Sequence, residues 1–418
     1  MDRTASYFRR GVIAGCAVIL AAVATGCSSS ATSDSSPSSP ASLPNDGSIR
    51  SSMTKLLSGD GPPGVIAVIQ NGDQRYEVAE GKANVSSGAL MSGDASIRIA
   101  SVSKAYNGAI VLSLASKGEL ALSGTVGQLL PTAPKAWGKA TVAQVLQHTS
   151  GIPDYIKSPQ FIKEFVADPQ MQLTPEQLIG YVSDKPLAFP PGSKYQYSDT
   201  DNVVAGLIAE QVTGKTYNDL LKEIVTSPLN LPVTSLPDTV AMPEPKINGY
   251  APADPAESSA SPSGPQDVTD FLNPELAWAS GGMITTANEL NTFFRSYAGG
   301  KLFNASTREQ QLQFVPGGGG PPGPGVNSSG LGIYRYKTAC GEFLGHTGNL
   351  PGYTTFVGST TDGTQSVVVL ANGQVTERSD PAKYQQLSAV WDEALCAAKG
   401  ITRGSASSTP SSPATATP

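Results

Sequence analysis

Near both ends of the chain, apolar residues form short runs of the kind typical of β-strands. Close to the N-terminal end, two short runs flank the dipeptide Asn71-Gly72, which favours a tight hairpin. Toward the other end, three or four strands follow closely, each bounded by turn residues. The predicted strands span 65–69, 75–80, 331–336, 342–346, 353–358 and 366–371. Helices are predicted before the first strand, over 49–57, and after the last, between Pro381 and Gly400. We therefore predict one antiparallel sheet built from both chain ends and flanked by terminal helices.

In the middle of the chain, the spacing of apolar residues is typical of α-helices instead. Apolar residues at helical spacing lead to a glycine stop three times, at Gly118, Gly151 and Gly214. Two stretches rich in proline or glycine, 252–266 and 315–330, are predicted as long loops. The fold class expected is α+β, with one continuous unit over 48–399.

The N-terminal segment has the pattern of an export signal. Arg3, Arg9 and Arg10 precede an apolar run that ends in Ala24-Thr25-Gly26-Cys27. We interpret 1–26 as a lipoprotein signal peptide and Cys27 as a diacylated membrane anchor on the extracytoplasmic face. An ordinary signal peptide or an uncleaved anchor helix is the alternative. Residues 27–47 are predicted to be a Ser/Pro-rich spacer, and 400–418 a disordered tail.

Charge and cysteine content narrow the class of protein. The formal net charge is −6 and no basic cluster follows the signal, which argues against nucleic acid as a partner. Of four cysteines, Cys16 is lost with the signal and Cys27 takes the lipid. Cys340 and Cys396 remain, and an exported protein favours a disulfide between them. Two buried free thiols are the alternative.

The first chemical motif is Ser101-Val102-Ser103-Lys104. A serine hydroxyl becomes a useful nucleophile only beside a base, and residues three apart on a helix share a face. Lys104 can therefore activate Ser101, and this spacing is the nucleophile motif of β-lactamases and penicillin-binding proteins. A second match, Ser52 to Lys55, adjoins the spacer and is interpreted as a chance occurrence. A helix-start serine beside a solvated lysine is the structural alternative for Ser101.

The second motif is Tyr197-Ser198-Asp199, before an amphipathic helix. Tyr197 can shuttle a proton between Ser101 and the leaving group when a neighbouring cation stabilises its phenolate. The alternative is an aromatic residue packed at a helix start, with Asp199 as N-cap.

The third motif is Gly345-His346-Thr347-Gly348-Asn349. A strand edge of this kind can line a cleft, with His346 and Thr347 donating hydrogen bonds to substrate. The backbone N–H groups of Asn349 and Ser101 are then expected to form an oxyanion hole. His148 is interpreted as structural. No third nitrogen or thiol ligand accompanies these histidines, so neither a metal nor another cofactor is expected.

These residues resemble the serine β-lactamase and DD-peptidase family, in its branch with H-T-G in place of K-T-G. Within the family they are most similar to the secreted actinomycete D-alanyl-D-alanine carboxypeptidases. The similarity also covers Trp278-Ala279 and Ala371-Asn372, and Cys340 and Cys396 match a disulfide there. The resemblance implies an all-helical domain against an α/β domain, with the active site between them. It also implies acylation of Ser101 by peptides ending in D-Ala-D-Ala, and by β-lactams.

Three positions depart from the family pattern. Asp199 stands where an asparagine that contacts the lysine and the substrate amide is usual, and an acid there would favour charged Lys104. Asn349 replaces a threonine, and Tyr334 replaces an arginine that binds the terminal carboxylate of the substrate. The last two changes weaken the expectation of a free C-terminal D-Ala.

Three functions follow in order of preference. The first is a serine-type D-alanyl-D-alanine carboxypeptidase-like hydrolase of cell-wall stem peptides. The second is an esterase or D-amino-acid amidase on the same scaffold. The third is a cell-wall-binding lipoprotein that turns over poorly, and a true β-lactamase ranks last because no additional base for deacylation is evident. A monomer is expected.

Overall fold

The computed structural model describes residues 43–252, 264–317 and 326–402. The described residues belong to one unit that begins at Ser42. The predicted signal peptide, Cys27 and most of the spacer and tail lie outside them and stay predictions; the last two residues of the predicted spacer, Asp46 and Gly47, already belong to a helix. No helix in these three ranges is long and apolar enough to cross a membrane.

A single antiparallel sheet joins the two ends of the chain, as predicted. The N-terminal hairpin β1–β2 lies beside the last strand, β12, because β1 pairs with it from Val65↔Ala371 to Asn71↔Gln365. The order across the sheet is β2-β1-β12-β11-β10-β9-β8-β7. The strands are β1 (Gly64–Asn71), β2 (Gln74–Gly81), β7 (Val315–Pro316), β8 (Val326–Ser329), β9 (Tyr334–Thr338), β10 (Gly341–Leu350), β11 (Tyr353–Ser359) and β12 (Gln365–Ala371).

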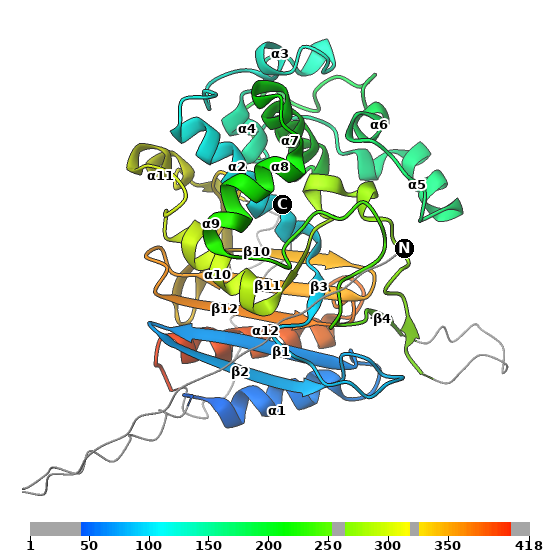
Figure 1. Cartoon of the computed structure of the whole chain (residues 1–418), viewed down its shortest axis with the longest axis vertical. Helices are drawn as coiled ribbons and strands as arrows, with labels where there is room; N and C mark the ends of the chain where they lie inside the picture. The colour runs from blue at the N-terminus through cyan, green and yellow to red at the C-terminus, as the bar shows by residue number, and fades with distance from the viewer. Residues whose placement is uncertain (1–42, 253–263, 318–325, 403–418) are drawn as a thin grey trace, which may run out of the picture. The chain divides into compact units, whose positions relative to one another are not determined.

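Alternation along the central strands divides the sheet into two apolar faces. In β1, Val65 and Ile69 face a core shared with the terminal helices α1 (Asp46–Leu57) and α12 (Pro381–Ala398). Ile66 and Val68 face the larger core, which continues into the helical part of the chain. Figure 1 shows α1 and the helical segment α2 to α9 on opposite sides of the sheet. Helix α10 (Ala287–Ala298) packs on β11 and β12 from the helical side.

The helical part is built on two long buried helices. Helix α2 (Ser103–Ser116) and helix α7 (Asp199–Thr213) contact each other, and α7 ends at Gly214 with φ 68°, as the glycine stop predicts. The remaining helices are α3 (Val126–Leu129), α4 (Val142–Leu146), α5 (Pro159–Ala167), α6 (Pro175–Gly180), α8 (Tyr217–Leu221), α9 (Ser227–Leu229) and α11 (Ala305–Gln311). Short two-stranded pairs also form, β3 (Ser96–Arg98) with β6 (Ile284–Thr286) and β4 (Tyr250–Ala251) with β5 (Gln266–Asp267).

The sequence was wrong about parts of the two predicted loops. Residues 315–330 were expected to be a loop throughout, but β7 and β8 pair there and extend the sheet past β9. Likewise, Gln266 at the end of the other loop belongs to β5. These strands are two to four residues long and owe their form to a neighbouring strand, so the local pattern carries no signal for them.

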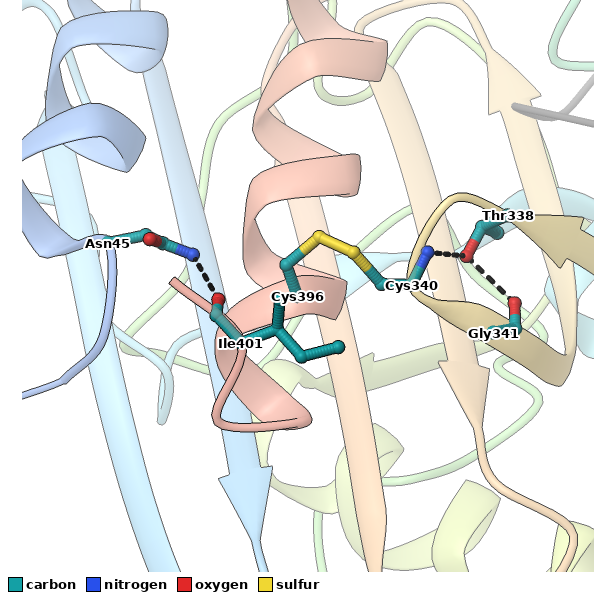
Figure 2. The surroundings of a disulfide bond; sticks show 6 residues. All are labelled: Asn45, Thr338, Cys340, Gly341, Cys396 and Ile401. Atoms are coloured by element: carbon teal, nitrogen blue, oxygen red, sulfur yellow. Dashed lines mark hydrogen bonds between the residues drawn. A yellow bond between two sulfur atoms is a disulfide. The ribbon is translucent and has the colours of Figure 1, made fainter. Parts of the chain in front are cut away.

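A disulfide ties the sheet to the last helix. Cys340 in the β9–β10 turn bonds Cys396 on α12, with the Cα atoms 5.1 Å apart, as predicted (Figure 2). Thr338 Oγ1 accepts a hydrogen bond from the Cys340 N–H at 3.2 Å and fixes the turn. Asn45 Nδ2 donates to Ile401 O at 2.8 Å, so the two ends of the unit are joined close by.

Removing this crosslink should destabilise the fold without disabling the site. The bond closes a loop of 56 residues, so replacing both cysteines by alanine should lower the free energy of unfolding by about 2–4 kcal/mol. Denaturant unfolding of the double variant and of the oxidised wild type measures the difference. Equal stability of the two would show that the crosslink contributes nothing to the fold.

Candidate active site

The chain places Ser101 at the junction of the sheet side and the helical side. Strand β3 ends at Arg98, a 3₁₀ turn covers Ala100–Val102, and α2 follows from Ser103. Ala100 has φ 49°, a left-handed conformation that is costly for a residue with a Cβ atom. Such strain persists only where the surrounding structure imposes it. Here the strained conformation precedes Ser101, which is half-buried and lines a pocket.

Lys104 lies one helical turn further and meets three acceptors. Its Nζ donates to Ser101 Oγ at 3.3 Å, to Asp199 Oδ1 at 2.5 Å and to the Ser280 carbonyl at 2.6 Å. An ammonium group has three donors, and all three are used. The Lys104 side chain is only 1% exposed, so it acts from beneath the pocket. The pairing of Lys104 with Asp199 expected from the sequence is therefore present.

Tyr197 completes the group around the nucleophile. Lys104 Nζ lies 4.8 Å from the centre of the Tyr197 ring. The Tyr197 hydroxyl is buried, and among the described residues it makes no hydrogen bond of regular geometry. The Ser101 hydroxyl is nevertheless close enough to lower the pKa of Tyr197. Burial dominates and raises the pKa of Tyr197 well above its usual value. Tyr197 is therefore a neutral phenol at rest, suited to passing a proton on.

A buried network beneath the site holds the Tyr197 segment. His148 Nδ1 lies 3.1 Å from Asp201 Oδ2, and the Ser150 hydroxyl donates to Asp201 Oδ1 at 2.5 Å. The His148 ring packs on that of Tyr197, with centroids 4.6 Å apart. Its carbonyl accepts from the Gln196 N–H at 2.8 Å. Burial lowers the pKa of His148 well below its usual value, so the ring is neutral. These contacts give His148 the bracing role expected of it.

The pocket beside Ser101 has a volume of about 310 Å³ and mostly apolar walls. Helix α5 and the turn before it supply one wall, and the segment 272–281 supplies another. Ser101, Asp199, Ser280, Asn349 and Gln374 are the non-aromatic polar residues among those that line it. The larger apolar and aromatic side chains of the walls are Tyr155, Ile156, Phe161, Ile162, Phe165, Leu272, Leu276, Leu350 and Pro351.

Strand β10 closes the pocket opposite α2 through a glycine. A Cβ atom on Gly348 would lie 2.2 Å from the Ile99 carbonyl oxygen and 3.2 Å from the Ala100 Cβ. Only glycine therefore lets β10 approach the strained turn before Ser101. The next residue, Asn349, lines the pocket, and its side-chain Oδ1 accepts from Thr354 Oγ1 at 2.9 Å. Asn349 is therefore part of the pocket lining, and its role in an oxyanion hole stays a prediction.

Three predicted substrate contacts lie elsewhere. His346 and Thr347 are each 1% exposed and are not among the pocket-lining residues, and His346 Nδ1 bonds the Thr347 carbonyl at 2.7 Å. Burial lowers the pKa of His346 to about 3, so it is neutral. The Trp278 ring packs 5.1 Å from that of Tyr217, away from the pocket lining. None of these three side chains is among the pocket-lining residues, and their contacts with substrate stay predictions.

Two features of the site were missed in the sequence. One is the Ser280 carbonyl, which accepts a hydrogen bond from Lys104. It lies in a turn in which Trp278 has a φ of 40°, and no residue type in the sequence indicates this strained conformation. The other is the α5 wall, although an apolar helix face that stays exposed was a possible signal. Ile156, Ile162 and Val166 are 40%, 48% and 76% exposed around it. Across the described ranges, no group of three His, Cys, Asp or Glu residues is arranged to hold a metal ion.

Comparison with known proteins agrees with this geometry. The family model described as Beta-lactamase matches residues 49–390. A D-stereospecific amidohydrolase from Streptomyces sp. has a similar structure, with a TM-score of 0.70 and 29% identity over 82% of this chain and 98% of that one. Penicillin-binding protein 4* of Bacillus subtilis (strain 168) is 22% identical over 77% of this chain and 70% of its own length. Esterase EstB of Burkholderia gladioli is 28% identical, over 43% of this chain and 50% of its own. Ser101, Lys104 and Tyr197 lie together beside one pocket, and the chain belongs to the β-lactamase family of serine hydrolases.

Proposed function

We propose that the chain hydrolyses amide or ester bonds of compounds with an apolar acyl part, by forming an acyl-enzyme on Ser101. Its activity is then that of an amidase or esterase, the second of the functions expected from the sequence. The observation that carries the proposal is the wall of the pocket: large apolar side chains surround Ser101 on the α5 side. Such a wall gains free energy by covering an aromatic or branched aliphatic group.

The charges at the pocket favour an amidase or esterase activity over a carboxypeptidase activity that releases free D-Ala. No lysine or arginine is among the pocket-lining residues of the described chain. Tyr334, at the position of the family's carboxylate-binding arginine, is buried, and its hydroxyl lies 2.9 Å from that of Tyr195. A substrate with a terminal carboxylate would thus lose its hydration without gaining a cationic partner.

The chemistry follows from the contacts of Lys104. Lys104 reacts in its unprotonated form: its Nζ takes the Ser101 proton and becomes the ammonium that Asp199 Oδ1 and the Ser280 carbonyl bind. Ser101 Oγ then bonds the carbonyl carbon, and the backbone N–H groups of Ser101 and Asn349 stabilise the oxyanion. The C–N or C–O bond breaks as Lys104 returns a proton to the leaving group, relayed by Tyr197. Water repeats these steps to release the acid.

A carboxypeptidase-like activity on D-Ala-D-Ala peptides is the second candidate. The similarity to Penicillin-binding protein 4* over 70% of that protein favours it. The same nucleophile and lysine would serve both reactions, so the two candidates differ only in what the pocket selects.

A three-substrate comparison decides between them. We expect D-phenylalaninamide or p-nitrophenyl hexanoate to be cleaved with a kcat/KM at least about 100-fold above that for D-Ala release from diacetyl-L-Lys-D-Ala-D-Ala, since an unpaired buried carboxylate costs a few kcal/mol. Purified Ser101→Ala protein gives the background rate. The reverse order of rates would overturn the proposal in favour of the second candidate.

A further inference from the structure

Asp199 is the one carboxylate that lines the pocket among the described residues. It is the first residue of α7, and its backbone N–H donates to Asp154 Oδ1 at 3.1 Å, which fixes its place. The carboxylate is 12% exposed, whereas the Lys104 side chain that it pairs with is 1% exposed and does not line the pocket. A bound molecule therefore meets the acidic end of this ion pair and not the basic end.

The other ionisable groups nearby do not offset this charge on the pocket side. Asp154 pairs with Lys157 at 3.2 Å, and burial together with Asp199 raises its pKa to about 6, so at neutral pH it is a second carboxylate. Asp201 is wholly buried with His148 and Ser150, and burial raises its pKa well above the usual range. Tyr155 lines the pocket as a neutral phenol that donates to the Leu276 carbonyl at 2.7 Å.

The distance from Asp199 to the nucleophile suits one particular substrate group. Asp199 Oδ1 is no more than 5.8 Å from Ser101 Oγ, because a 2.5 Å and a 3.3 Å contact join them through Lys104 Nζ. A carboxylate at this range can reach a group on the carbon next to the carbonyl that Ser101 attacks. In an amino-acid amide or ester, that group is the α-ammonium.

We propose that Asp199 selects substrates by charge: it binds the α-ammonium of an apolar amino-acid amide or ester and disfavours a carboxylate at the same place. The substrate class is thus an aminoacyl amide or ester with a free amino group and an aromatic or branched side chain. This inference rests on the proposed function, because it names the substrate class for the same pocket. Asp199 is a specificity-determining residue here in addition to its contact with Lys104.

The test compares two substrates that differ only at the α-amino group, which is charged in one and acetylated and neutral in the other. D-phenylalanine p-nitroanilide and its N-acetyl derivative carry the same acyl side chain and leaving group. We expect wild type to prefer the free amine by at least about tenfold in kcat/KM, the value of one charged hydrogen bond. Asp199→Asn should reduce this preference by about tenfold. Because the ratio is taken within one variant, any effect of the substitution on Lys104 cancels.

A control variant distinguishes direct contact between Asp199 and the substrate from a general effect of negative charge near the pocket. Glu164→Gln on α5 removes a negative charge from the helix that forms the pocket wall, but Glu164 is half-buried, accepts hydrogen bonds from Tyr181 and Gln160, and does not line the pocket. This variant should keep the wild-type ratio within about twofold. An unchanged ratio in Asp199→Asn, or an equal fall in both variants, would overturn the inference.

Binding without turnover keeps the two proposals distinguishable. If wild type cleaves none of the amide, ester and anilide substrates, the proposed function fails, and calorimetry with 2-phenylethylamine and 3-phenylpropionate still tests Asp199. Tighter binding of the amine by wild type, reversed in Asp199→Asn, supports the inference. Tighter binding of the carboxylate by wild type contradicts it, and this comparison stands even when the variant does not fold.

Discussion

Replacing Ser101 by alanine should abolish acyl transfer while leaving the fold intact. Loss of the nucleophile of a serine hydrolase reduces turnover by roughly 10⁴- to 10⁶-fold. Ser101 is half-buried, and its hydroxyl accepts only the longest of the three Lys104 contacts, at 3.3 Å. The unfolding midpoint should therefore stay close to that of wild type. Ester hydrolysis and thermal unfolding, measured on the same preparation, check both statements.

The second serine–lysine match in the chain supplies the control. Ser52 lies on α1, on the far side of the sheet, and donates to Glu393 Oε1 at 3.1 Å. Ser52→Ala should retain wild-type rates. A reversed pattern, with Ser52→Ala inactive and Ser101→Ala active, would place the chemistry at a different site.

Adding one methyl group at Gly348 should damage the site through geometry alone. The Cβ atom would meet the Ile99 carbonyl at 2.2 Å, so β10 must retreat from the turn that carries Ser101. Displacing an oxyanion donor by about 1 Å costs roughly 100-fold in rate. Overpacking of this kind also costs about 1–3 kcal/mol of stability. We expect kcat/KM of Gly348→Ala to fall about 100-fold, with the loss mainly in kcat.

Gly180 offers a matched glycine for this experiment. A Cβ atom there has no neighbour within 4 Å, and its φ does not require glycine. Gly180→Ala should therefore keep both activity and stability. Full activity in Gly348→Ala would show that close approach of β10 is not needed for catalysis.

The parts of the fold that the sequence predicted are those encoded locally. The Asn71-Gly72 hairpin, the apolar run of β12 and the proline at the start of α12 each act within a few residues, and each was found. The sequence predicted that both chain ends share one sheet, but it did not predict that β1 pairs with β12. The edge strands β7 and β8 were missed because their form depends on β9.

The candidate site divides in the same way. Ser101 and Lys104 share one helix turn, so their spacing alone brought them together. The pairing of Lys104 with Asp199 was implied by the family resemblance and is present. The direction of the His346 and Trp278 side chains was not predictable, because burial on either face of a strand or turn is decided by distant packing. The apolar wall comes from segments more than a hundred residues apart, α5 and 272–281.

One measurement tests the central claim, a covalent acyl-enzyme on Ser101, most directly. The protein is mixed with p-nitrophenyl hexanoate, quenched in acid before the first turnover is complete, and analysed by intact mass and peptide mapping. The account predicts one added hexanoyl group, located on the peptide that contains Ser101 and absent from Ser101→Ala. A hexanoyl group on any other residue, or steady turnover with no adduct at any quench time, would contradict it.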